Sequence, residues 1–150
     1  MPAVVRPIAY DDLDMAVSII QAGSLTPDNE DPERLDDYWR AVQETRARGG
    51  DVVVAETQGE VVGVCQVIVF THFQHAGRPC CELESVHVRS DHRGKGIGAL
   101  ILGYAEQLAR DAGCYRIQLT SRNVRVDAHR FYLTHGFSQT SQGFKKLLLD

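Results

Sequence analysis

The chain has 150 residues, of which 43% are hydrophobic and 24% are charged, and its formal net charge is -4 at pH 7. This length and balance predict one globular domain over residues 1–150 and exclude a disordered or fibrous protein. No apolar run reaches the roughly 20 residues that span a bilayer, and no signal peptide follows Met1, so we expect a cytoplasmic protein without a membrane partner. The acidic balance argues against a nucleic acid partner, because phosphates bind basic surfaces.

Two helices are expected first along the chain. Apolar residues at i, i+3, i+4 and i+7 predict an amphipathic helix over residues 11–22. A cap residue, a proline and an acid at residues 31–33 predict the start of a second helix, which the glycine pair at 49–50 ends. Residues 25–30 are polar and predict a mobile segment between the two helices.

Strands follow the second helix. Residues 51–56 and 61–70 are rich in β-branched side chains, and residues 57–60 between them are typical of a hairpin turn. Residues 71–79 are expected to form a loop, and residues 80–88 a third strand.

The C-terminal half alternates helices with strands. Helices are predicted over residues 99–111 and 128–135, with a strand over residues 115–120 between them. Phe137 and the apolar run 144–149 suggest a closing hairpin. The whole order predicts an α+β fold, or mixed α/β, in which helices flank a mixed and mostly antiparallel sheet.

The cysteines and histidines do not predict a metal site. Three of the four cysteines lie in strand-like runs and none forms a C-x-x-C pair, so we interpret them as reduced, buried hydrophobic residues rather than a disulfide framework. His72 and His75 resemble half of a zinc site, but they lie in an irregular loop and no metal is expected there. The cysteines are Cys65, Cys80, Cys81 and Cys114.

The strongest chemical signal is a glycine-rich turn between the predicted strand 80–88 and the predicted helix 99–111. Glycines at alternate positions let backbone N–H groups converge on an anion at the start of a helix, and two basic side chains add charge. The spacing also fits a dinucleotide loop, but that needs a parallel sheet and an acid about 20 residues later, so a nicotinamide-dependent oxidoreductase is the weaker alternative. The turn comprises Arg93, Gly94, Lys95, Gly96, Ile97 and Gly98.

Two separate motifs resemble one family. The run VHVRSDHRGKGIG at residues 86–98 is similar to the GNAT pattern of a strand, a turn and R/Q-x-x-G-x-G/A, and residues 127–137 resemble its second motif, A-x-x-F-Y-x-x-x-G-F. The motifs look closest to a bacterial subgroup that includes aminoalkylphosphonate N-acetyltransferases. Ser90 replaces the usual proline, and Arg125 replaces a frequent asparagine, with Asn123 two residues earlier.

The resemblance implies a GNAT fold, acetyl-CoA as co-substrate and direct acetyl transfer to a primary amine of a small molecule. It implies that the glycine turn holds the pyrophosphate and that the backbone of the preceding strand pairs with the pantetheine arm. Further cofactor contacts are expected in the loop and helix after the last predicted strand. The expected cofactor-binding residues outside the turn are Val86, His87, Val88, Asn123 and Asp127.

The resemblance also implies two catalytic side chains. Glu84 is expected to take the proton of the amine, with Glu82 as the alternative, and period-2 alternation predicts that both share one strand face with Val86 and Val88. Tyr132 is expected to protonate the leaving thiolate.

Several other side chains have weaker expected roles. The acids between residues 28 and 37 are solvated or attract an amine, and His129 and His135 line their helix. Arg122 and Arg125 could serve the phosphates of the cofactor or an anionic acceptor. The remaining alternative function is a non-catalytic acyl-CoA sensor, and the family analogy allows a homodimer.

Overall fold

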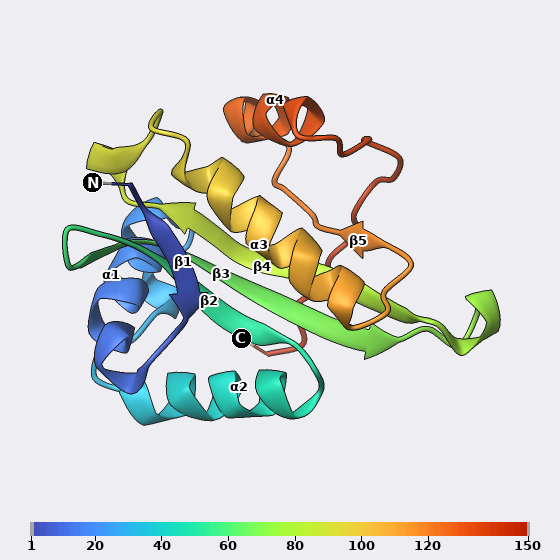
Figure 1. The fold of residues 1–150 in the computed structure, drawn as a ribbon, viewed down its shortest axis with the longest axis horizontal. Coiled ribbons are helices and arrows are strands. Elements are labelled where there is room, and N and C mark those ends of the chain that lie inside the picture. The colour runs from blue at the N-terminus through green and yellow to red at the C-terminus, as the bar shows by residue number, and fades with distance from the viewer. Residues whose placement is uncertain (1, 150) are drawn as a thin grey trace.

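The computed structural model describes residues 2–149 of the chain. Five strands form one sheet in the order β1-β2-β3-β4-β5, antiparallel except between β4 and β5, which are parallel (Figure 1). The predicted mixed, mostly antiparallel sheet is therefore confirmed. The strands are β1 Val4–Pro7, β2 Asp51–Thr57, β3 Glu60–Thr71, β4 Pro79–Val88 and β5 Ile117–Gln118.

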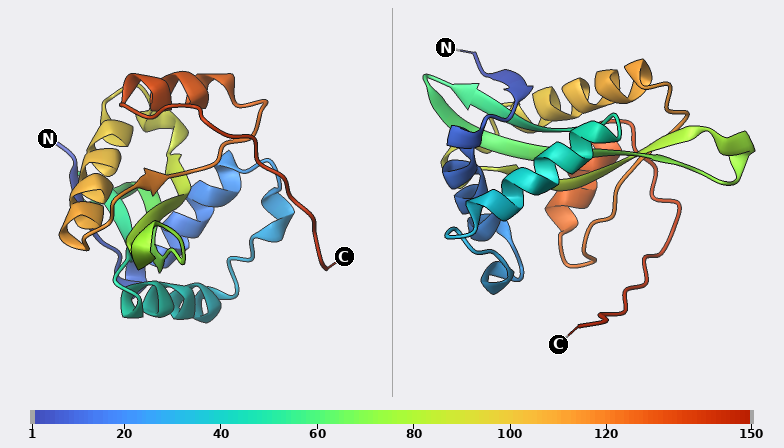
Figure 2. Two further views of the ribbon diagram at one scale, coloured as in Figure 1. Left: turned by 90° about the vertical axis from the view of Figure 1, so that its right-hand side faces the viewer. Right: turned by 90° about the horizontal axis from the view of Figure 1, so that it is seen from below.

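Helices cover both faces of this sheet, and each face has its own hydrophobic core (Figure 2). Val53 and Ala55 of β2 face the core under α3, whereas Val54 between them faces the core under α1 and α2, as alternation requires. The four helices are α1 Leu13–Gly23, α2 Leu35–Ala47, α3 Ile97–Asp111 and α4 Val126–Thr134. Within residues 2–149, no helix combines the length and the apolar character that crossing a bilayer demands.

The hairpin between β2 and β3 forms as the sequence predicts. Its two turn residues, Gln58 and Gly59, have φ values of 53° and 77°. Two successive residues with positive φ are typical of the type I′ turn, whose twist matches that of paired strands.

The second helix starts later than predicted. Instead of placing Pro32 in the first helical turn, the chain closes a separate turn in which the Asp31 carbonyl accepts a hydrogen bond from the Arg34 N–H at 3.0 Å. The Asp31 side chain accepts a bond from the Glu33 N–H at 3.0 Å, so its capping ability is used in that turn. The helix then begins at Leu35.

Both ends of the chain also differ from expectation. Strand β1 was not predicted; it is a short run whose register with β2 pairs Val5 with Ala55. The predicted closing hairpin does not form. Residues 138–149 contain neither helix nor strand and run past the sheet as an extended trace (Figure 2). β5 has only two paired residues, so its outer edge offers few ladder groups to a further strand.

Candidate active site

The sheet is split between β4 and β5. The two strands pair only where Cys81 lies beside Ile117 and Glu82 beside Gln118, so the second half of β4 has a partner on its β3 side alone among the described residues. The two strands are not paired beyond Glu82 within residues 2–149. The open edge of β4 leads from Glu82 to the glycine turn after Val88.

A β-bulge lies in the middle of that open edge. Val64 of β3 pairs with His87 and Gln66 with Glu84, so Ser85 and Val86 together oppose the single residue Cys65. Ser85 has a φ of 55°, an uncommon conformation for a residue with a side chain. A bulge interrupts the ladder and leaves its extra residue unpaired, so backbone polar groups are available here.

The bulge corrects the predicted sharing of strand faces. Glu84 and His87 pair with residues that face α1 and α2, whereas Val86 and Val88 pack against the core under α3. Glu82 and Glu84 do share a face, but Val86 and Val88 lie on the opposite one. The inserted residue shifts the alternation by one position, which strict period-2 counting cannot detect.

The two carboxylates on this face have perturbed protonation. Burial raises the pKa of Glu84 above its usual value, and the nearby charge of Glu82 raises it further. Burial also raises the pKa of Glu82, partly offset by Gln118 and by the charge of Arg116. One oxygen of Glu82, Oε2, is buried and has no hydrogen-bond partner within residues 2–149.

The glycine turn has open space in front of it. Gly94 and Gly96 have φ values of 76° and 81°, and a Cβ added at either would meet no atom within 4 Å. The first N–H groups of α3 lie directly after Gly96 and have no partner inside the helix, which favours an anion there. Lys95 and Arg93 are both exposed beside the loop.

Gly98 differs from the two glycines before it. A Cβ at Gly98 would lie 2.8 Å from the ring of Phe131 on α4, so this position is needed for packing between α3 and α4. From the sequence, all the glycines of the turn were expected to make room for a phosphate group. At Gly98, the ring of Phe131 occupies that space instead.

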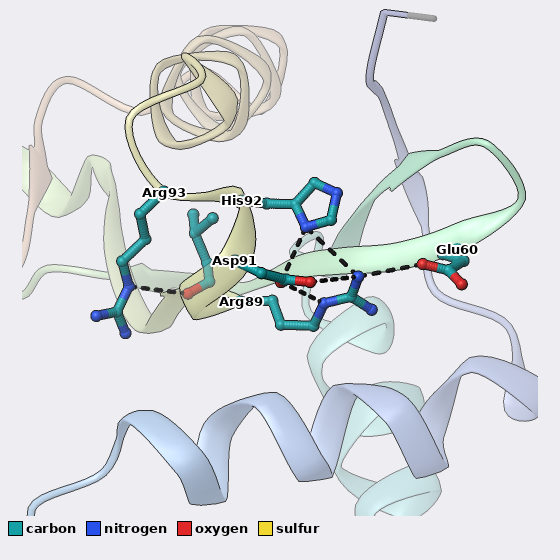
Figure 3. Close-up of polar contacts among 6 residues, drawn as sticks. Glu60, Arg89, Asp91, His92 and Arg93 are labelled. Carbon is teal, nitrogen blue, oxygen red and sulfur yellow. Dashed lines mark hydrogen bonds and ion pairs between the residues drawn. The ribbon is translucent and has the colours of Figure 1, made fainter.

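A polar network shapes the turn that connects β4 to the glycine loop (Figure 3). The Arg89 guanidinium pairs with Asp91 at 2.7 Å and with Glu60 at 3.1 Å, and His92 contacts Asp91 at 2.9 Å. Arg93 Nε donates to the carbonyl of Val88, the last residue of the strand, at 3.2 Å. Arg93 is therefore held toward β4, with the glycine loop following it.

Tyr132 projects from α4 into the core under α3. Its ring packs edge-on against Phe131 and Phe137, with centroids 5.4 and 5.8 Å away. Burial raises the pKa of its hydroxyl, and both Cys65, opposite the bulge, and Arg125 lie close enough to affect that pKa. The tyrosine is thus protonated near neutral pH and lies near the bulge.

The remaining predicted residues are more scattered. Asn123 is exposed in the turn before α4, and Asp127 is fully exposed with only a 3.8 Å contact to Arg130. His129 contacts the backbone carbonyl of Arg122, and His135 contacts that of Phe131. The side chain of His87 lies against α1, away from the face that carries Val86 and Val88.

The histidines and cysteines form no metal cluster in residues 2–149. His72 contacts the Tyr115 hydroxyl through Nδ1 at 2.7 Å and stacks on His75, at the far end of the β3–β4 hairpin from the glycine loop. The four cysteines are unpaired, and Cys114 alone among them is partly exposed.

Two features of this region were not predicted from the sequence. Ser85 gives no local signal of a bulge, since neither glycine nor a change in composition marks it. Arg125, expected to serve the phosphates of the cofactor or an anionic acceptor, instead donates from Nη2 to the Gly23 carbonyl at 2.7 Å.

Comparison with known proteins places this geometry among acetyltransferases. The family model described as Acetyltransferase (GNAT) family matches residues 15–137. The chain is similar to the aminoalkylphosphonate N-acetyltransferase of Salmonella typhimurium, 38% identical over 95 residues, which are 63% of this chain and 61% of that protein. It is also similar to N-acetyltransferase 8B of Rattus norvegicus, 33% identical over 67% of this chain and 45% of that protein. The chain thus spans about three fifths of the first relative and under half of the second.

A solved structure matches over nearly the full length. It is the crystal structure of a transcriptional regulator from Bacillus halodurans C-125, which is 30% identical and superposes with a TM-score of 0.89 over 98% of this chain and 100% of that one. The doubly wound parallel sheet that the dinucleotide interpretation of the glycine turn needs does not occur in residues 2–149.

Proposed function

Because the chain belongs to the GNAT acetyltransferase family, we propose that it transfers the acetyl group of acetyl-CoA to a primary amine of a small molecule. The observation that carries the proposal is the open edge of β4, which joins the glycine loop to a bulge flanked by Glu84 and Tyr132. Cytoplasmic location, a single domain over residues 1–150 and a homodimer stay predictions.

The residues present fit acetyl-CoA. Gly94 and Gly96 leave open space before the N-terminus of α3, which suits a pyrophosphate, and Lys95 adds charge. The unpaired edge from Ser85 to Val88 suits the amides of a pantetheine arm, which would add to the sheet like a short strand. Acetyl-CoA supplies the thioester that the amine attacks. An N–H group freed by the bulge is the proposed donor to the oxygen that gains charge.

Glu84 is the proposed proton acceptor. An alkylamine is mostly protonated at pH 7, with an unperturbed pKa of about 10.4, and must lose a proton before it attacks. The raised pKa of Glu84 brings this carboxylate closer to neutral pH, which suits general-base work. Glu82 shares its face and is proposed to bind the ammonium group.

The charges around the carboxylates favour an acceptor that carries an acid as well as an amine. The positive charge of Arg116 lowers the pKa of Glu82, and that of Lys145 lowers the pKa of Glu84. Positive and negative groups side by side suit a zwitterion, in line with the aminoalkylphosphonate activity in the name of the Salmonella relative.

Release of the CoA thiol over a panel of amines tests the proposal. We expect short aminoalkylphosphonates to react faster than alkylamines of the same length. In Glu84→Gln, kcat/KM should fall by about 10- to 10⁴-fold, the range of general-base effects, and the loss should shrink at high pH where more amine is neutral. Glu44→Gln is the matched control, since Glu44 is exposed on α2.

Two outcomes would contradict the proposal. An equal loss in Glu84→Gln at every pH would remove Glu84 as the base. Acetyl-CoA binding without thiol release for any amine would instead favour a non-catalytic acyl-CoA sensor. That alternative is kept because the similar protein from Bacillus halodurans is named a transcriptional regulator.

A further inference from the structure

Three elements meet at Gly23, the last residue of α1. Its carbonyl accepts the hydrogen bond from Arg125 Nη2 at 2.7 Å, across 102 residues of sequence. Carbonyls at a helix C-terminus lack partners within the helix, and a positive charge there also complements the helix dipole. Arg125 is half-buried and precedes α4, so the bond joins α1 to the start of α4.

The third element is β4, which contributes His87. A Cβ added at Gly23 would lie 2.6 Å from His87 Nδ1, so the imidazole fits only because this residue is glycine. Burial and the charges of Arg125 and Arg93 lower the pKa of His87, which keeps the ring neutral in this tight contact. Gly23 therefore packs against His87 and accepts the hydrogen bond from Arg125, beside the strand that carries Glu84.

A second contact of α4, within the helix, also involves a glycine. Phe131 packs on Gly98 at the start of α3, where a Cβ would come within 2.8 Å of its ring. Tyr132 is the next residue. The helix thus lies between two contacts, one to the cofactor side of the molecule at Gly98 and one to α1 at Gly23.

The segment that follows Gly23 lies on the carboxylate side of the sheet. Residues 24–34 connect α1 to α2, the two helices that cover the face of Glu82 and Glu84, and they carry Asp28 and Glu30. α1 packs on β4, so an acceptor amine that reaches Glu84 from this face would lie on the side of the sheet that α1 covers. The position of residues 24–34 depends on where α1 ends.

We infer that Arg125 is a positioning residue that ties α1 and residues 24–34, the acceptor side of the site, to the helix that carries Tyr132. The name acceptor side rests on the proposed function, whereas the hydrogen bond between Arg125 and Gly23 is a property of the fold. The glycine loop leads into α3, whereas the Arg125 side chain donates to Gly23 at the end of α1. Loss of the tie should therefore affect the acceptor more than acetyl-CoA.

Amide hydrogen exchange and kinetics on the full chain test the inference. In Arg125→Ala, amides in residues 24–30 should exchange about 10-fold faster, the effect expected when a charge-assisted hydrogen bond is lost. The acceptor KM should rise by about 5-fold or more and the acetyl-CoA Kd by less than about 2-fold, for the same reason. Arg125→Lys keeps a donor and a charge, so its amide exchange and acceptor KM should stay close to those of the wild type.

Arg130→Ala is the control for the exchange measurement, because it removes an exposed arginine from the same helix. Faster exchange confined to Arg125→Ala supports the tie, with circular dichroism melts to verify that each variant is folded. Unchanged exchange in residues 24–30, or an equal increase in Arg130→Ala, would overturn it. If the wild-type chain acetylates no amine, the proposed function fails, and the exchange data still decide the tie.

Discussion

Among single side chains, Tyr132 is the proposed donor to the leaving thiolate, and its side chain is half-buried. Its ring is packed by Phe131 and Phe137, and burial raises its pKa, so it is a protonated donor at neutral pH. We predict that Tyr132→Phe keeps its melting temperature and acetyl-CoA affinity, while kcat falls by roughly 10- to 10³-fold.

Steady-state kinetics with calorimetry check this prediction. Parental turnover, in a step limited by chemistry, would mean that the tyrosine only packs. A large drop in melting temperature would mean that the hydroxyl satisfies a buried partner.

Glu82 should reduce the stability of the fold at neutral pH. Burial raises the pKa of Glu82 in the folded state above its value in the unfolded chain. The folded state is therefore most stable below the unfolded pKa, where the carboxyl is neutral, and it loses that stability as pH rises through the folded pKa. Glu82→Gln removes the charge and should raise Tm at pH 7 by roughly 2–4 °C, the shift expected for about 1 kcal/mol. Thermal melts at pH 7 and pH 4 should show the gain at the higher pH and little at the lower. A gain of the same size at both would exclude ionisation as its cause.

At the level of elements, the turn between β4 and α3 uses its glycines in two ways. Gly96→Val would place a side chain in the open space and in a backbone conformation with φ near 81°, so we predict loss of acetyl-CoA binding in a folded but weakened protein. Gly98→Ala would meet Phe131 instead, and should cost about 1–3 kcal/mol of stability, as overpacking does.

Calorimetry and denaturant unfolding on both variants separate the two roles. If Gly96→Val binds acetyl-CoA normally, the loop is not the phosphate site. If Gly98→Ala is as stable as the parent, the contact between α3 and α4 is looser than the structure indicates.

Across the whole molecule, the three buried cysteines should be inert in the folded state. Burial raises the pKa of Cys65 and Cys81 to about 12, which leaves little thiolate for reaction. Only Cys114 is partly exposed, so a thiol reagent should modify it first and the other three about 100-fold more slowly, after opening of the fold. Mass spectrometry of labelled peptides measures the rate at which each cysteine is modified.

Mass spectrometry of the cysteines also tests whether the acetyl group is transferred directly. If Cys114→Ala retains full activity and no acetylated cysteine accumulates with acetyl-CoA, no thiol relay operates. Rapid labelling of Cys65 or Cys81 in the native protein would contradict the assigned burial.

The sequence by itself determined the features that depend on neighbours in the chain. The hairpin turn at Gln58-Gly59, the helical stripe of α3 and the glycine loop at its start are local, because turn conformation, periodicity and helix capping act over a few residues. The two motifs also identified the family.

Only the tertiary structure decided what depends on distant partners. The bulge at Ser85 exists through pairing with β3, and it moves Val86 and Val88 to the face opposite Glu84. The use of Gly98 by Phe131 and the bond from Arg125 to Gly23 join segments 33 and 102 residues apart. The predicted closing hairpin was wrong, since residues 138–149 form no strand. Long-range pairing is set by which surfaces meet after folding, and periodicity along the chain does not encode it.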